Sequence, residues 1–431
     1  MKWIQVERSP ELNGTVSIPG SKNSALALLA AACLADEPVA LSGIPDIADF
    51  KAVCRLADGI GLSVHRDKSG IVHIDPRSIR HTSLDPVQSS SFRTAYYFAG
   101  ALLAKFGKVS VGYPGGDDFG SRPIDQHIKA LKMLGARFTF HDKHYEVEAR
   151  ELNGASIYFD TITSGATINA MLAAVRAKGS TVLYNAARDP EVTDTANFLN
   201  QMGAKISGAG TDTIRIEGVR YLRGCRYTVI PDRLIAAAFL IAAGVAGGTV
   251  TVCDVVPEHL SACTAKLREI GLDIEEGDQS ITARSTGVLR ATRVRAAMYP
   301  AFPTDVQQPL TALLTQAPGK SIVCDTVFPG RFNHVQQLNR MGADIKVRSG
   351  VAFIRGGIPL QGALVHASDI RAGICLILAG LAAEGTTTIA GVQHIERGYE
   401  NVVGAFRSLG ASIKYAEAGI SHPGIRLTDA N

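Results

Sequence analysis

The segment at residues 113–123, YPGGDDFGSRP, places groups that can transfer protons or bind anions on a chain rich in turn-forming residues. Asp117 and Asp118 follow two glycines, and Arg122 comes five residues after Asp117. A carboxyl group can give or take a proton, and a guanidinium group binds phosphate or carboxylate. The glycines and prolines predict a loop. Two interpretations stay open at this point: a plain surface turn, or a mobile lid that carries a titrating acid over a site.

Charged residues also stand at the start of apolar segments elsewhere in the chain. Six Ala/Leu-rich segments are typical of buried helices, and five of them begin with a charge. The amino end of a helix is already partly positive, so a cation there is unfavourable unless an anion shares the position. Exposed charges on a rim are one explanation, but the repetition favours an anion-binding cleft. The five residues are Lys22, Arg93, Arg233, Asp305 and Arg371.

These segments belong to an internal repeat of about 70 residues. Successive segments, counted from Lys22, start 71, 73, 67, 72 and 66 residues apart, and a β-branched strand follows each one. A second, amphipathic helix then ends at a glycine, which predicts a helix stop. Each unit therefore predicts helix, strand, helix, strand, strand. Because such units are long for a solenoid, two domains of three units are favoured. The stop glycines are Gly61, Gly135, Gly203, Gly271, Gly342 and Gly410.

Composition excludes several classes of protein. A chain of 431 residues predicts two or more domains, and a net charge of +4 with mixed signs argues against a nucleic-acid-binding protein. Seven scattered cysteines without a CxxC pair predict reduced thiols in the cytoplasm. The amino-terminal residues do not resemble a signal peptide, and the longest apolar run, residues 25–35, is too short to span a membrane. Neither a dinucleotide fingerprint nor zinc-ligand spacing occurs, so no cofactor and no metal are expected.

Five motifs resemble a known family. They are SIPGSKNSALALLAAACLADEPV, PGGDDFGSRPIDQHI, TSGATINAMLAAVRAKG, FPTDVQQPLTALLTQA and the pair SDIRAGICLILAG and HIERGYENV. Over residues 3–415 the chain is similar to the UDP-N-acetylglucosamine 1-carboxyvinyltransferases of the EPSP synthase superfamily, more than to the sister enzyme of the shikimate pathway. The resemblance implies an inside-out α/β barrel fold in two domains, with six βαβαββ-type repeats, three per domain. Residues 22–230 would be the catalytic domain with a lid at 113–123, and residues 1–21 plus 231–431 the second domain.

The resemblance also implies a reaction. The enolpyruvyl group of phosphoenolpyruvate would pass to the 3-hydroxyl of UDP-N-acetylglucosamine with release of phosphate, the first committed step of peptidoglycan synthesis. This activity would link the protein to cell wall biogenesis, cell shape and the cell cycle, as a cytoplasmic monomer without nucleic-acid or membrane partners. One alternative is a paralogue that acts on another nucleotide such as UMP, as in nucleoside antibiotic biosynthesis. Another is a non-catalytic relative that only binds UDP-sugars.

Roles for individual residues follow from the family match. Asp305 would orient or deprotonate the attacking hydroxyl, and Lys22 and Arg397 would also serve catalysis. Phosphoenolpyruvate would be bound by Lys22, Arg122, Arg331, Arg371 and Arg397. Asn23, which follows Lys22 in the GSKN motif, would also bind substrate. The nucleotide sugar would be bound by Arg93, Arg122, Pro123, Ile124, Asp125, Gln126, Thr161, Thr163, Ser164, Gly165, Asp305 and Val327.

Departures from the family pattern concern both the acid and the acceptor. Asp117 stands at the position of the family's lid cysteine, the usual general acid, so resistance to the epoxide fosfomycin is expected. A free aspartic acid has a pKa of about 3.9, which lid closure over two anions would raise and nearby arginines would oppose. Four other departures leave the identity of the acceptor open. They are Ser90, Thr161, Asp189 and Ile235.

Overall fold

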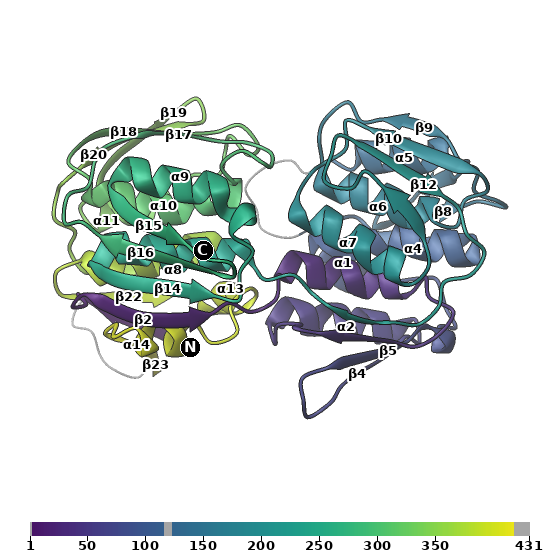
Figure 1. Cartoon of the computed structure of the whole chain (residues 1–431), viewed down its shortest axis with the longest axis horizontal. Coiled ribbons are helices and arrows are strands. Elements are labelled where there is room, and N and C mark those ends of the chain that lie inside the picture. Colours follow the sequence, from purple (N-terminus) through teal and green to yellow (C-terminus); the bar gives the residue numbers. More distant parts are fainter. Residues whose placement is uncertain (1, 116–122, 418–431) are drawn as a thin grey trace.

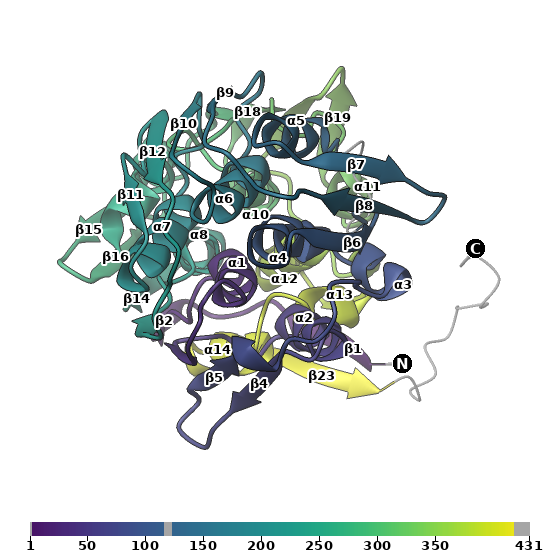
Figure 2. The ribbon, with the colours of Figure 1, turned by 90° about the vertical axis from the view of Figure 1, so that its right-hand side faces the viewer.

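The computed structural model describes residues 2–115 and 123–417, and these form two lobes side by side (Figure 1). Helices α1 to α7 lie in one lobe, and helices α8 to α14 lie in the other together with the amino-terminal strands (Figure 1). In each lobe the apolar helices are at the centre and the sheets are at the periphery (Figure 2). This arrangement confirms the predicted inside-out α/β fold.

The first lobe contains three units of the predicted helix–strand–helix–hairpin type. Additional elements precede or follow them: α3 (Pro86–Ser90), β9 (Ser156–Tyr158), β13 (Arg226–Thr228) and the short 3-10 helices η1 (Pro76–Ser78) and η2 (Arg93–Tyr96). The units are α1 (Lys22–Ala32), β3 (Val39–Ser42), α2 (Ala48–Gly59), β4 (Ser63–Arg66), β5 (Val72–Asp75); α4 (Tyr97–Phe106), β6 (Lys108–Gly112), α5 (Asp125–Met133), β7 (Arg137–Phe140), β8 (His144–Glu148); and α6 (Ser164–Ala174), β10 (Ser180–Tyr184), α7 (Pro190–Gln201), β11 (Lys205–Ser207), β12 (Thr213–Glu217).

The second lobe repeats the plan, and its last unit is completed by the amino-terminal strand β1 (Lys2–Glu7), which pairs with both β22 and β23. Strands β2 (Leu12–Ser17), β17 (Arg293–Ala296), β21 (Leu364–His366) and the short helix η3 (Pro257–Leu260) are additional. The units are α8 (Arg233–Ala246), β14 (Gly248–Cys253), α9 (Ser261–Ile270), β15 (Leu272–Glu276), β16 (Ser280–Ser285); α10 (Thr304–Gln316), β18 (Gly319–Asp325), α11 (Asn333–Arg340), β19 (Asp344–Arg348), β20 (Val351–Gly356); and α12 (Ile370–Ala382), β22 (Thr386–Ala390), α13 (Val392–Glu396), α14 (Val402–Ser408), β23 (Ile413–Glu417).

The sheets share one topology, as expected for repeats. Five of the six sheets of the described chain have four strands, and in each of them one parallel pair is extended by antiparallel strands. In the sixth, of order β6-β8-β7, a single parallel bridge between Ser83 and Ser110 takes the place of the fourth strand. The six predicted helix stops all have positive φ, from 86° at Gly61 to 115° at Gly271, which glycine adopts without steric cost.

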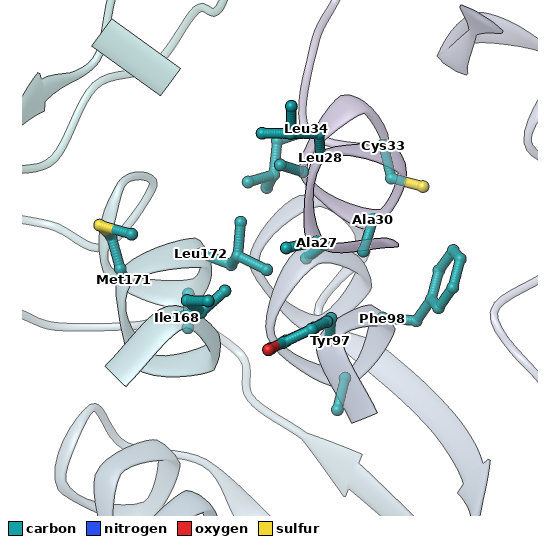
Figure 3. Packing of buried hydrophobic residues seen from close by; sticks show 14 of the residues in the cluster. Ala27, Leu28, Ala30, Cys33, Leu34, Tyr97, Phe98, Ile168, Met171 and Leu172 are labelled. Atoms are coloured by element: carbon teal, nitrogen blue, oxygen red, sulfur yellow. The ribbon is translucent and has the colours of Figure 1, made fainter. Parts of the chain in front are cut away.

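Each lobe is stabilised by an apolar core of its own. Helix α4 packs on both α1 and α6, and small and branched side chains such as Ala27, Leu172 and Ile168 fill this region (Figure 3). Every residue of α1 except Asn23 is buried, which explains why its sequence is apolar on all faces. The first core contains residues between 25 and 229, and the second contains residues 4–18 and 234–413.

The chain passes between the lobes in two adjacent segments. The Ser21 N–H donates to the Ile230 carbonyl at 2.7 Å, and Gly20 forms an antiparallel bridge with Pro231. Each crossing leads directly into a buried helix, α1 or α8. The crossings therefore place the first residues of these helices at the boundary between the lobes.

Candidate functional site

A cleft of about 500 Å³ receives residues from both lobes and is lined by the amino ends of all six buried helices. The five charged residues that precede or open the apolar segments line this one cleft. Their convergence rules out a set of separate charges on a rim. The residues that mark the six helix ends are Lys22 of α1, Tyr97 of α4, Ser164 of α6, Arg233 of α8, Asp305 of α10 and Arg371 of α12.

One group of cations in the lining is organised around Asp49, in the first turn of α2. Its carboxylate lies 2.6 Å from the Lys22 ammonium and 2.8 Å from Nε of Arg397. Burial lowers the pKa of Lys22, although Asp49 opposes this effect. Burial raises the pKa of Asp49, but the two cations outweigh it and hold this pKa below its ordinary value. Asp49 comes from the first lobe and Arg397 from the second, so this group connects the lobes.

A second group of cations is organised around Asp305, at the amino end of α10. Its carboxylate contacts Nη1 of Arg331 at 2.5 Å and Nε of Arg371 at 3.1 Å. Burial raises the pKa of Asp305, but the two guanidinium groups overcome that effect and leave the pKa far below its ordinary value. Asp305 is therefore ionised at neutral pH and is a weak base as long as both arginines hold it. An anion that draws these arginines away would make the carboxylate more basic.

Another wall of the cleft is formed by α5 and the loop before α6. The Gln126 side chain accepts from the Asp160 N–H at 2.9 Å and so fixes this loop to α5. Thr163 caps α6, and its oxygen accepts from the Ala166 N–H at 3.5 Å. Gly165 lies so close to Tyr96 that an added Cβ would be 2.4 Å from its hydroxyl, which excludes any larger residue without movement. This wall therefore presents a capped helix end to the cleft.

The cleft collects most of the residues that the sequence predicts for the site. Ile124 instead packs against the first core, and Ile235, one of the departures from the family pattern, is buried in the second core. Asp117 and Arg122 lie outside the described residues. The predicted residues that line the cleft are Lys22, Asn23, Arg93, Pro123, Asp125, Gln126, Thr161, Thr163, Ser164, Gly165, Asp305, Val327, Arg331, Arg371 and Arg397.

A third buried ion cluster lies in the cleft, and sequence reasoning did not assign it. Arg233 lies 3.3 Å from Glu191 and 3.5 Å from Asp189, across the boundary between α8 and α7. The Ser164 hydroxyl donates to Asp189 at 2.8 Å. Burial raises the pKa of Glu191 and Asp189 adds to this, whereas Arg233 opposes it. Arg233 was visible as a charge before an apolar segment, but nothing in the sequence shows which acids it meets. Asp49 was missed for the same reason.

Comparison with known proteins agrees with this geometry. Residues 6–422 match the family described as EPSP synthase (3-phosphoshikimate 1-carboxyvinyltransferase), and the chain belongs to this family. A protein of Geobacillus kaustophilus named UDP-N-acetylglucosamine 1-carboxyvinyltransferase 2 is 50% identical over 413 residues, 96% of each chain. A Clostridium botulinum protein named UDP-N-acetylglucosamine 1-carboxyvinyltransferase is 46% identical over 96% of this chain and 99% of its own. Within the EPSP synthase family, the chain thus groups with the UDP-N-acetylglucosamine 1-carboxyvinyltransferases.

Solved structures share the fold. The enolpyruvyl transferase NikO from Streptomyces tendae superposes with a TM-score of 0.86 at 25% identity, over 96% of this chain and 98% of its own. EPSP synthase from Acinetobacter baumannii superposes with a TM-score of 0.73 at 19% identity, over 97% of this chain and 100% of its own. The second likeness concerns the fold alone.

Proposed function

We propose that the protein transfers the enolpyruvyl group of phosphoenolpyruvate to the 3-hydroxyl of UDP-N-acetylglucosamine and releases phosphate, as the first committed step of peptidoglycan synthesis. The observation that carries the proposal is the cleft in which Lys22, Arg331, Arg371 and Arg397 surround two carboxylates. Relatives of that name, which match along nearly the whole chain, support the choice of acceptor.

The cations are suited to a substrate with a phosphate and a carboxylate. Each of the four cations lines the cleft and forms an ion pair with Asp49 or Asp305. A bound substrate anion would therefore compete with these carboxylates for the same donors. Arginines that turn toward phosphoenolpyruvate would release Asp305. Its carboxylate could then take the proton of the acceptor hydroxyl while the new bond to C2 forms.

The reaction also needs an acid for C3 of phosphoenolpyruvate. In the addition step the acceptor oxygen bonds to C2 and a proton is added to C3. In the elimination step C3 loses a proton and phosphate leaves from C2. We assign the acid to Asp117, which lies outside the described residues. Because a carboxylate is a much weaker nucleophile than a thiolate, this assignment implies insensitivity to fosfomycin. Asp117→Cys should stay active and become sensitive to time-dependent inactivation, whereas covalent labelling of residues 113–123 in the unaltered protein would contradict the assignment.

An acceptor panel tests the proposed function. Purified protein is incubated with phosphoenolpyruvate and one of UDP-N-acetylglucosamine, UDP, UMP or shikimate 3-phosphate, and released phosphate is measured. We expect release only with the UDP-sugar. Release with UMP alone would replace the acceptor by the alternative nucleotide. No release with any acceptor, from protein that binds UDP-N-acetylglucosamine in calorimetry, would favour a non-catalytic binding protein.

We further propose that the two lobes are domains, residues 22–230 and residues 1–21 plus 231–431, which close on the substrates as a cytoplasmic monomer. The two separate cores and the paired crossings at Gly20 and Pro231 support this division. Small-angle scattering should give a smaller radius of gyration with both substrates than without them. All seven cysteines are free in the structure, in line with a reducing compartment. In the described part of the chain, no helix has the length and apolar character needed to cross a membrane.

A further inference from the structure

A second group of chemically competent side chains lies outside the cleft, on the β7–β8 hairpin. His141, His144 and Glu146 each offer one ligand atom, and these three atoms all lie within 4.8 Å of one another. In the described ranges 2–115 and 123–417 no other three His, Cys, Asp or Glu residues meet this condition. None of the three lines the cleft.

The hairpin backbone brings these side chains together. Along β8, Tyr145 and Val147 are buried, so His144 and Glu146 point to the opposite face of the strand. The His141 N–H donates to the His144 carbonyl at 2.9 Å, which places the two histidines across from each other. Their rings are stacked, with centroids 4.5 Å apart and an angle of 17° between the planes. Both imidazoles and the carboxylate therefore share one face of the hairpin.

The backbone under this face is held on both sides. Strand β8 pairs with β6 as well as with β7, so Glu146 lies in the middle of a three-stranded sheet. The Tyr113 hydroxyl donates to the His141 carbonyl at 2.9 Å, and the Tyr113 ring packs 5.8 Å from that of Tyr145. Only the side chains need to move for the three ligand atoms to meet on one ion.

The donor set selects the kind of ion. Two imidazole nitrogens and a carboxylate oxygen suit zinc and its neighbours, whereas magnesium and calcium prefer oxygen ligands alone. Two ligands of a tetrahedral zinc ion are about 3.4 Å apart, given metal–ligand bonds of about 2.0–2.2 Å. To reach this value from separations within 4.8 Å, at least one imidazole has to rotate out of the stacked arrangement so that both rings point a nitrogen at the same ion. The fourth position would be taken by water.

The ion pair that Glu146 forms with Lys108 is weak. Nζ of Lys108 lies 3.5 Å from its carboxylate, and the two side chains are 55% and 36% exposed. An ion pair of this kind contributes at most about 1 kcal/mol, so a divalent cation can replace the ammonium group. His141 is exposed, and the other two side chains are partly exposed, so an ion has access from solvent.

We propose that His141, His144 and Glu146 form a zinc site that fixes the turn between β7 and β8 and, through Tyr113, the chain that leaves β6. The spacing His-x-x-His-x-Glu matches no common zinc motif, which is why the sequence predicted no metal. The three residues become one site only through the pairing of the hairpin. The proposal does not depend on the transferase activity.

Calorimetric titration of the full-length, chelator-treated protein with zinc chloride tests the site. We expect one ion per chain. His144→Ala should weaken binding by at least about 100-fold, because loss of an outer-shell partner alone costs about 10–100-fold and this change removes a ligand. Cobalt(II) should give the visible absorption of a tetrahedral complex with the unaltered protein and lose it with His144→Ala.

The β4–β5 hairpin offers a matched control, since His65 and His73 also lie opposite each other there and are exposed. His73→Ala should leave zinc affinity unchanged. The proposal is overturned if the unaltered protein binds no zinc, or if His144→Ala, with unchanged thermal unfolding in the absence of zinc, keeps the full affinity. An equal loss from His73→Ala would also overturn it.

Discussion

Replacement of Asp49 by asparagine should destabilise the protein and at the same time strengthen its hold on anions. The substitution keeps the size of the side chain but removes the negative charge between Lys22 and Arg397. Asp49 and Lys22 are about nine-tenths buried as side chains, and Arg397 is 23% exposed. Loss of one partner from a buried ion pair costs about 3–5 kcal/mol, and the partial exposure of Arg397 favours the lower half of that range. For a domain of about 200 residues, a cost of about 3–4 kcal/mol corresponds to a fall in Tm of about 6–16 °C.

The assay is thermal unfolding with and without phosphoenolpyruvate. In the unaltered protein the ligand has to compete with Asp49, whereas in Asp49→Asn it meets two cations that have lost their carboxylate. The ligand should therefore raise the Tm of the variant more than that of the unaltered protein, and its affinity should increase by about tenfold or more, as for a charge-assisted hydrogen bond of about 1.5–3 kcal/mol.

Asp46 supplies the control, because it pairs with Lys51 at 2.9 Å just before the same helix, but with side chains that are 45% and 55% exposed. Asp46→Asn should change Tm by no more than a few degrees, in keeping with about 0–1 kcal/mol for an exposed pair. The reasoning is refuted if both variants have the same Tm, or if phosphoenolpyruvate stabilises Asp49→Asn no more than the unaltered protein.

Three further outcomes are expected. Asp305→Asn should lower kcat by about 10²–10⁴-fold in the phosphate-release assay, because it removes the proposed base. KM should change less. A rate near that of the unaltered enzyme would exclude this role. Asp189→Asn should weaken UDP-sugar binding in calorimetry, because Asp189 holds both Ser164 and Arg233, whereas the exposed neighbour change Asp212→Asn should not. The folded-state pKa values of Asp49 and Asp305 lie below the unfolded value of about 3.9, so their contribution to stability is complete above that pH and is lost as pH falls through the folded values. Tm should therefore fall steeply below about pH 4, and less so in Asp49→Asn; equal slopes would contradict the assignment.

The repeat made most of the fold predictable. The six apolar segments and the six stop glycines recur at nearly constant spacing, and each glycine has the backbone conformation that its position requires. The completion of the last unit by β1 was not visible, because its pairing with β22 joins segments about 380 residues apart in sequence. Such long-range pairings leave no local pattern.

The candidate site was predictable to the extent that it depends on helix ends. Lys22, Asp305 and Arg371 stand where charge interrupts an apolar pattern, and all three line the cleft. Asp49 and Glu191 could not be found in this way, since an acid in the first turn of an amphipathic helix is ordinary and stabilises the helix by itself. Their roles depend on which cation the tertiary fold places opposite them.

A single carboxylate at the crossing constrains how the two lobes can move. One oxygen of Asp232 accepts from the N–H groups of Leu234 and Ile235 at the start of α8, and the other accepts from the Lys22 N–H at the start of α1, at 3.0 Å. The same side chain thus caps the amino ends of two helices that belong to different lobes. A sliding motion would break one of these bonds, whereas a rotation about Asp232 keeps both. Asp232 therefore serves as a pivot for rotation of one lobe relative to the other. Distances between the lobes should change least near residue 232 and most at the far rim of the cleft.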